Sequence, residues 1–393
     1  MLTALDHSRP ARSVVVLEEP DLWRAKGLED KSRAHPCFGS FVFGRYQQDD
    51  QYLDAAARVG EVTAIAPGLE YAVVAAARLA EIRGLPGAGP SAAGILRDKF
   101  LLRTVTRSAG MPCPGFRKIS SAEELAKFGE NRSFVLKPTN RQASVGVIRV
   151  CAGTDPYRAW SDSTTASEGN QTANRDLCWE YMAEDYLEGP EFSTECLVRD
   201  GQLIFCNVTA KTVLEGEHPV EIGHAVPGWG QDELPIWCSS AQSLIKATGF
   251  ATGMLHAEWI LTASGPCLVE CAGRPPGDRI TELIDLAYGE SFVSAWARLL
   301  SGANPLYPQV PSRAAAIRFL SGLRSQPKSS VLAAARGIPG VVRVEVKVPE
   351  VVNDSPPQSV RSSWDRQGSA IAVADSPAEA VIRAEETIRA LVT

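Results

Sequence analysis

Two glutamates and an arginine in the second half of the chain have the spacing of a metal and phosphate site. Glu258 lies in the apolar run HAEWIL, Glu270 lies in the run CLVECA, and a short turn separates the two runs. Both runs favour strands, and adjacent antiparallel strands can place two carboxylates within reach of one cation. Arg274 follows, with a planar guanidinium suited to a phosphate or a carboxylate. Strand glutamates are also common as solvated structural residues, so that alternative stays open.

Two lysines nearer the N-terminus could neutralise phosphate groups. Lys137 ends the apolar run SFVLK and precedes the small-residue loop TNRQASVG at 139–146. The backbone N–H groups of Ser144 and Gly146 in this loop could fold over phosphate oxygens. Lys99 lies in the helix-like run ILRDKFLLR. Either lysine alone could equally be a solvated surface residue.

A connector between two predicted strands could hold the rest of a nucleotide. The run EDYL at 184–187 precedes a Gly-Pro turn and the next strand, which begins near Glu191. Such a connector can present backbone donors and acceptors of Glu184 and Leu187 to a flat base. The carboxylate of Glu191 could accept hydrogen bonds from ribose hydroxyls. Taken alone, the same run is an ordinary acidic turn.

The elements that must position these residues follow from hydrophobic periodicity. Apolar β-branched runs predict strands at 13–17 and 61–66, and a helix is predicted from 70 to 84, so that the N-terminal region forms a small parallel α/β unit. A helix is expected at 95–109 and another at 281–301. Further strands are expected at 133–137, 145–150, 179–187, 191–198, 203–209, 255–261, 267–270, 314–319 and 341–348, and a closing helix at 377–391. The polar segment 153–175 suggests an exposed helix and a loop without assignable chemistry.

Bulk composition excludes several classes of protein. The net charge is −6 and no basic run occurs, which argues against nucleic acid or an anionic membrane as the main partner. No apolar stretch reaches membrane-spanning length, and the first residues do not resemble a signal peptide. The nine cysteines are dispersed without a CxxC pair, which fits a reducing cytoplasm.

Taken in order, these motifs resemble the ATP-grasp superfamily over roughly residues 95–305. The residues that carry the resemblance are Lys99, Lys137 with its loop, the 184–187 connector, and Glu258 and Glu270 with Arg274. Within the superfamily, the chain is most similar to the L-amino acid ligases that make dipeptides. This likeness is carried by three runs, namely TAKT at 209–212, VEIGHAVP at 220–227 and ECAGR at 270–274.

The resemblance implies a role for each candidate residue. For the nucleotide, it implies that the ATP phosphates are bound by Lys99, Lys137, Ser144 and Gly146, the adenine by Glu184 and Leu187, and the ribose by Glu191. Mg²⁺ (or Mn²⁺) would be bound by Glu258 and Glu270. For the substrates, Arg274 would contact the acyl phosphate, Lys211 would contact a phosphate or a substrate carboxylate, and Glu221 and His224 would line the substrate pocket. Many members carry Asn two places after the second glutamate, where this chain has Ala272. The complete coordination of the metal therefore stays open.

The implied fold is α/β (α+β) and has four parts. They are an N-terminal small parallel α/β domain at 1–94, an ATP-grasp small lobe with the phosphate loop at 95–178, a large lobe with the metal site at 179–305, and a C-terminal α+β extension at 306–393.

The implied activity is an ATP-dependent carboxylate–amine ligase that forms an amide, such as a dipeptide, through an acyl phosphate and releases ADP and phosphate. Such chemistry needs positioning and charge neutralisation and no side-chain nucleophile, and the sequence contains no GxSxG motif. The expected partners are a carboxylic acid and an amine, and a homodimer would fit the family. Three alternatives remain: a biotin-type carboxylase, a purine-pathway ligase and a non-catalytic nucleotide-binding protein.

Overall fold

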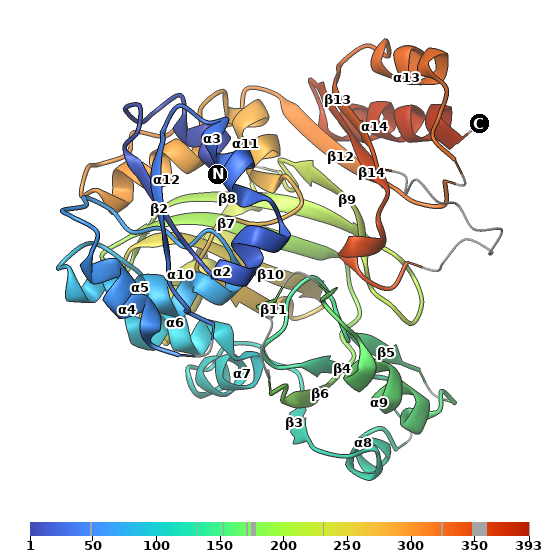
Figure 1. The fold of residues 1–393 in the computed structure, drawn as a ribbon. Helices are drawn as coiled ribbons and strands as arrows, with labels where there is room; N and C mark the ends of the chain where they lie inside the picture. Colours follow the sequence, from blue (N-terminus) through green and yellow to red (C-terminus); the bar gives the residue numbers. More distant parts are fainter. Residues whose placement is uncertain are drawn as a thin grey trace.

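A computed structural model describes residues 1–47, 49–130, 132–151, 153–169, 172–173, 178–230, 232–323, 325–347 and 360–392. Its framework consists of a two-stranded, a four-stranded and an eight-stranded sheet. Figure 1 shows the eight-stranded sheet at the centre, the four-stranded sheet with its helices below it, and the C-terminal elements at the upper right. No helix among these residues is long and apolar enough to cross a membrane.

The N-terminal region forms the expected parallel sheet, but with a different second strand. β1 (Val14–Glu18) pairs in parallel with β2 (Phe38–Phe43), whereas the predicted strand at 61–66 is irregular. The aromatic residues of β2 explain the difference, because Phe41 stacks on Trp23 with ring centroids 4.4 Å apart. The helical elements of this region are α1 (Leu2–Leu5), α2 (Pro20–Ala25), α3 (Leu28–Arg33), α4 (Gln51–Ala57), η1 (Glu70–Ala72) and α5 (Val73–Ile82).

The helix predicted at 95–109 is two helices, and the break places Lys99. α6 (Pro90–Arg97) ends before Asp98, which is extended and caps α7 (Lys99–Ser108) by accepting hydrogen bonds from the N–H groups of Phe100 and Leu101. An aspartate cap satisfies N–H groups that a helix start leaves unpaired. Lys99 is therefore the first residue of α7, where its own N–H donates to Thr139 O at 2.8 Å.

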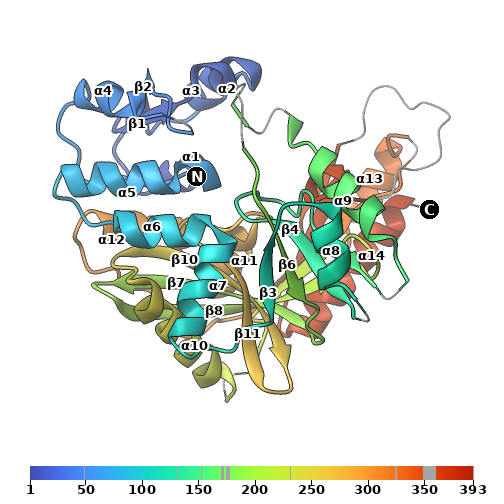
Figure 2. The ribbon, with the colours of Figure 1, turned by 90° about the horizontal axis from the view of Figure 1, so that it is seen from below.

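The four-stranded sheet forms a small lobe with its own core. It is antiparallel, with the strand order β3 (Phe116–Ile119), β6 (Tyr181–Asp185), β4 (Phe134–Pro138) and β5 (Ile148–Val150). α8 (Ala122–Phe128) and α9 (Pro156–Thr165) cover it, as Figure 2 shows, and Leu125, Phe134 and Leu136 lie in the core. Of the polar segment 153–175, residues 170–171 and 174–175 lie outside the described residues.

The eight-stranded sheet carries most of the candidate residues. All its pairings are antiparallel. In order, its strands are β11 (Gly265–Ala272), β10 (Gly253–Thr262), β7 (Glu191–Arg199), β8 (Gln202–Val213), β9 (Glu221–Val226), β12 (Ala314–Leu320), β14 (Gly368–Ala374) and β13 (Val341–Val346). The C-terminal strands thus extend the same sheet through the pairing of β12 with β9. The last residue of the strand predicted at 341–348 lies outside the described residues.

Helices cover both faces of the large sheet, so its central strands are buried on both sides. Alternate residues of β7 lie in different cores: Leu197 packs with α11 (Ile280–Tyr288) and α12 (Phe292–Leu300), whereas Cys196 and Val198 pack with α10 (Leu234–Thr248). This alternation is the two-residue period of a strand. α13 (Ser329–Arg336), the turn η3 (Ser363–Asp365) and α14 (Pro377–Val392) complete the C-terminal part. The helix predicted at 281–301 is interrupted at Gly289.

Candidate active site

The candidate residues converge on one cavity of about 420 Å³ between the two lobes. A cavity of this size suits a small-molecule ligand. The N-terminal region contributes Glu70, and the C-terminal extension contributes Trp364 and Arg366. Among the predicted site residues, those that line the cavity are Lys99, Lys137, Ser144, Glu184, Leu187, Glu191, Lys211, Glu221, His224, Glu258, Glu270 and Arg274.

Gly146 is the predicted site residue that does not line the cavity. Its φ of 76° is left-handed, and its carbonyl accepts a 2.6 Å hydrogen bond from Ser163 Oγ of α9. A Cβ at this position would lie 3.0 Å from Ser163 O. In this conformation the glycine is therefore needed for close packing of the loop on α9.

The predicted phosphate loop 139–146 is anchored at one end and strained at the other. Lys99 Nζ donates to Arg141 O at 2.8 Å, and Arg141 Nε lies 3.2 Å from Glu168 Oε1. Ala143 and Ser144 have φ of 58° and 57°, which is uncommon for residues other than glycine. Consecutive unusual φ values are the kind of strain that clusters at ligand sites.

Glu184 is held by two cations and does not offer a free carboxylate. Lys137 Nζ pairs with its Oε1, and Arg103 Nε donates to its Oε2 at 3.0 Å. Burial acts to raise the pKa of Glu184, but Arg103 and Lys137 outweigh it and lower that pKa. Only the backbone of Glu184 is left for a nucleotide base. Arg103 was not predicted from the sequence, although it lies four residues after Lys99 and therefore on the same face of α7.

The two predicted metal ligands face each other across a strand pair. Glu258 of β10 and Glu270 of β11 are cross-strand partners. In this structure each is matched by a lysine: Lys211 Nζ lies 2.6 Å from Glu258 Oε1, and Lys99 Nζ lies 3.1 Å from Glu270 Oε2. The donor set consists of hard carboxylate oxygens at the end of a cavity that also holds phosphate-type cations. This set fits Mg²⁺ or Mn²⁺.

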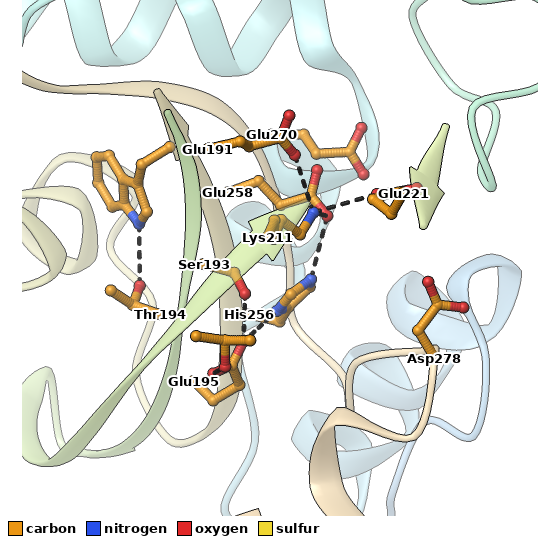
Figure 3. A network of polar contacts seen from close by, with 12 residues as sticks. Glu191, Ser193, Thr194, Glu195, Lys211, Glu221, His256, Glu258, Glu270 and Asp278 are labelled. Carbon is orange, nitrogen blue, oxygen red and sulfur yellow. Dashed lines mark hydrogen bonds and ion pairs between the residues drawn. The ribbon is translucent and has the colours of Figure 1, made fainter. Parts of the chain in front are cut away.

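Lys211 lies at the centre of an acidic cluster, as Figure 3 shows. Its Nζ also lies 3.0 Å from Glu191 Oε1 and 3.2 Å from Glu221 Oε1. Oxygens of Glu191, Glu221 and Glu258 lie within 4.8 Å of one another, which is close enough to hold a cation. Burial acts to lower the pKa of Lys211, but the three carboxylates outweigh it and raise that pKa well above its usual range. Burial raises the pKa of Glu191 to about 7, with Lys211 opposing and Glu258 adding to the shift.

A buried network of polar side chains supports Glu258 from inside the sheet (Figure 3). His256 Nε2 lies 3.3 Å from Glu258 Oε1, and its Nδ1 lies 3.0 Å from Glu195 Oε1. Glu195 is fully buried and accepts further hydrogen bonds from Ser193, Asn207 and Thr209. Burial acts to lower the pKa of His256, but Glu195 and Glu258 raise it to about 9.

Arg274 is fixed by an acid from the N-terminal region. Its Nε lies 2.6 Å from Glu70 Oε2, while Arg97 Nη1 lies 2.7 Å from Glu70 Oε1. Burial acts to raise the pKa of Glu70, but Arg274 and Arg97 lower it to about 2. Arg97 also donates to Asn140 O of the phosphate loop at 2.9 Å. No sequence signal marked Glu70, because it lies 204 positions before Arg274 in the chain.

The predicted substrate residues Glu221 and His224 lie on β9, next to the C-terminal extension. His224 Nε2 lies 3.2 Å from Asp278 Oδ2, and Arg366 pairs with the same carboxylate. Glu221 Oε2 lies 3.5 Å from Ser363 Oγ. Neither Asp278 nor Arg366 was predicted from the sequence, although Asp278 ends the glycine- and proline-rich run that follows Glu270.

Known proteins resemble this chain over a large part of its length. A family model described as an ATP-grasp domain matches residues 130–282. A D-alanine--D-alanine ligase from Paracidovorax citrulli is 30% identical over 57% of this chain and 68% of its own length. An L-arginine-specific L-amino acid ligase from Bacillus subtilis is 24% identical over 62% of this chain and 58% of its own length. The chain spans 58% to 63% of the length of that relative and of two others.

Solved structures share the fold along nearly the whole chain. The crystal structure of an L-amino acid ligase from Bacillus licheniformis matches with a TM-score of 0.73 and 17% identity, over 95% of this chain and 96% of that one. A carboxyaminoimidazole ribonucleotide synthase complexed with ATP matches with a TM-score of 0.69 and 14% identity, over 97% of this chain and 98% of that one. At these identities the likeness concerns the fold alone. The ATP-grasp fold predicted from the sequence is thereby confirmed.

Proposed function

The chain belongs to the ATP-grasp family, and from this premise we propose that it is an ATP-dependent carboxylate–amine ligase that works through an acyl phosphate. The observation that carries the proposal is the composition of the cavity. It joins phosphate-type cations, paired carboxylates and the buried His224, whereas no cysteine among the described residues lines it. Neither Ser144 nor Ser363, which both line it, has a hydrogen bond to a histidine among the described residues.

Each group then has a part in positioning the reactants. Lys99, Lys137 and the loop at Ser144 would hold the phosphates of ATP. Glu258 and Glu270 would hold Mg²⁺ or Mn²⁺, which when bound neutralises charge on the phosphates. Lys211 and Lys99 neutralise those carboxylates in the present structure. The backbone of Glu184 and Leu187 would contact the base, and Glu191 would contact the ribose.

The reaction then needs two displacements. A carboxylate oxygen of the acid attacks the γ-phosphorus of ATP, and the bond from that phosphorus to the ADP oxygen breaks. The amine nitrogen next attacks the acyl carbon, the bond to phosphate breaks, and the nitrogen loses a proton. Arg274, which Glu70 holds at the cavity wall, would steady the acyl phosphate and the departing phosphate. Amino acids as both acid and amine, and a dipeptide as product, are the finer part of the proposal.

A coupled assay with a labelled acid tests this chemistry. The protein is screened with pairs of amino acids for ADP and phosphate release, and products are identified by mass spectrometry. With an acid labelled with ¹⁸O in its carboxyl group, one labelled oxygen should appear in the released phosphate, because that oxygen attacked phosphorus and then left with it. AMP as the nucleotide product, or unlabelled phosphate beside coupled product, would contradict the mechanism. Light scattering during the same work tests the proposed homodimer.

A further inference from the structure

The C-terminal extension reaches the cavity through one short segment around η3. Ser363, Trp364 and Arg366 of this segment line the cavity. The guanidinium of Arg366 is 10% exposed and lies 3.8 Å from the ring centroid of Phe319 in β12. It also donates to Ser363 O at 2.9 Å and to Glu221 O at 3.2 Å. Arg366 is therefore a fixed part of the cavity wall.

Asp278 connects this arginine to His224. Arg366 Nη1 donates to Asp278 Oδ2 at 2.8 Å, and Nη2 pairs with Oδ1, so that the contact is bidentate. His224 Nε2 lies 3.2 Å from the same Oδ2. Bidentate contacts fix orientation as well as charge. The three side chains form a chain that runs from the extension to β9.

The backbone at Asp278, whose side chain makes this contact, has an unfavourable conformation. Asp278 and Arg279 have φ of 54° and 60°, which lie in the left-handed region that is unfavourable for residues with a Cβ. Arg279 is tied down by Glu282 at 2.8 Å and by Glu345 at 2.7 Å. Such strain persists where the surroundings enforce it, and it marks functional positions.

The contact with Asp278 determines which nitrogen of His224 carries the proton. A carboxylate only accepts hydrogen bonds, so Nε2 must be the donor. Arg366 already balances the charge of Asp278. The neutral imidazole that donates from Nε2 has its acceptor lone pair on Nδ1, and the side chain of His224 is 1% exposed. Nδ1 therefore keeps its lone pair. Within the described part of the chain, no group donates a hydrogen bond to this buried nitrogen.

We propose that Arg366 and Asp278 are positioning residues that present Nδ1 of His224 as a hydrogen-bond acceptor for an N–H group of the amino substrate. This inference rests on the proposed ligase function, which supplies a primary amine or ammonium group as the donor. A buried acceptor without a partner is destabilising, and such a donor would remove that cost. A carboxylate or a phosphate offers no proton and would leave the cost in place.

The tautomer of His224 can be observed without any turnover. Protein labelled with ¹⁵N-histidine gives long-range ¹H–¹⁵N correlations that distinguish the two tautomers, and a His224→Gln spectrum assigns the signal among the five histidines. The wild type should show the Nε2–H form. Asp278→Asn should lose this preference, because a carboxamide can donate as well as accept. Arg383→Lys, an arginine paired with Glu379 on α14, is the matched control and should change nothing.

Binding and kinetics supply the second measurement. The amino substrate should shift the Nδ1 resonance in the wild type but not in Asp278→Asn. Asp278→Asn and Arg366→Lys should raise the apparent KM for the amine by about 10-fold, while the KM for ATP changes less than about twofold. A merely structural role would weaken both substrates together and lower the melting temperature, so unfolding is followed for every variant.

The outcomes separate this inference from the proposed function. An Nδ1–H tautomer or an imidazolium in the wild type overturns the inference, and so does an equal rise in both KM values. If no acid and amine pair gives turnover, the ligase proposal fails, while the spectra of the free protein still decide the tautomer.

Discussion

At the scale of single residues, the candidate site consists of buried charges that compensate one another. Glu184 has two cations, Glu70 has two arginines, and Lys211 has three carboxylates. Burial of an unpaired charge is costly, so each of these groups depends on its partners. Removal of one member therefore affects the others, and the choice of substitution decides what a variant reports.

The metal carboxylates give the most direct residue-scale prediction. Glu258→Gln or Glu270→Gln should reduce turnover by about 100-fold or more, because each removes a charge that would hold the cation. The measurement is the initial rate of phosphate release at saturating substrates. Glu123→Gln on the exposed face of α8 is the control and should keep the wild-type rate. Near-normal turnover in either site variant would rule out the assignment.

Asp285 gives a prediction about stability that is independent of catalysis. Burial raises its pKa to about 7, although the N–H of Phe292 donates to the carboxylate at 2.7 Å and opposes the shift. The folded state therefore holds this proton more tightly than the unfolded state. The resulting stabilisation is complete below the unfolded pKa of about 4 and is lost as the pH rises through about 7.

Asp285→Asn should consequently gain stability relative to the wild type as the pH rises across that window. The amide keeps an acceptor for Phe292 but carries no charge. Urea unfolding at a series of pH values measures the difference in the free energy of unfolding. Asp155→Asn, an exposed cap of α9, should show no such trend. A constant difference for Asp285→Asn across the window would contradict the shifted pKa.

At the scale of elements, sequence periodicity predicted the strands that carry the site but not the breaks between helices. Glu258 and Glu270 were predicted on neighbouring strands, and they are cross-strand partners. The apolar period of the helix predicted at 95–109 continues through Asp98. Only the hydrogen bonds by which the Asp98 side chain caps α7 show that the helix is broken there. The run at 61–66 has the composition of a strand. The strand that pairs with β1 is nevertheless β2, because its aromatic residues pack on Trp23.

The parts of the site that the sequence did not reveal come from other elements. Glu70, Asp278 and Arg366 act on residues far away in the sequence, through contacts that exist only after the sheets have packed. A single sequence shows the spacing of residues within one element, so the lysines and glutamates of the strands could be predicted from it. The lobe to which β6 belongs also depends on such contacts. β6 lies within the range 179–305 proposed for the large lobe, but it pairs with β3 and β4 of the small lobe.

The η3 segment permits an element-scale prediction. Trp364 lines the cavity and is 50% exposed, so its removal should hardly affect stability. Trp364→Ala should raise the KM of the acid or the amine by about 10-fold through the loss of an apolar contact, with the KM for ATP unchanged. Steady-state kinetics with each substrate varied in turn make the measurement. Tyr157→Ala, an exposed aromatic of α9 that does not line the cavity, is the control. An unchanged KM for both the acid and the amine would place Trp364 outside the substrate pocket.

At the scale of the whole molecule, the cavity is the place where four parts of the chain meet. The small lobe brings Lys137, the large sheet brings Glu258, the N-terminal region brings Glu70 and the C-terminal extension brings Arg366. A ligand in this cavity would contact all four parts at once. Its binding free energy therefore adds to the stability of the whole assembly.

Magnesium and a non-hydrolysable ATP analogue should together stabilise the folded protein more than the analogue alone. With ligand at 100 times its Kd, the gain is about 2.7 kcal/mol, which differential scanning calorimetry detects as a higher melting temperature. The part of the gain that depends on magnesium should disappear in the Glu258→Gln, Glu270→Gln double variant, because the two carboxylates proposed to hold the cation, which now pair with Lys211 and Lys99, would be neutral amides. The Glu123→Gln control should keep it. Chelation with EDTA should return the wild type to the value for the analogue alone. Equal stabilisation with and without magnesium in the wild type would show that these two glutamates do not couple a metal to the nucleotide.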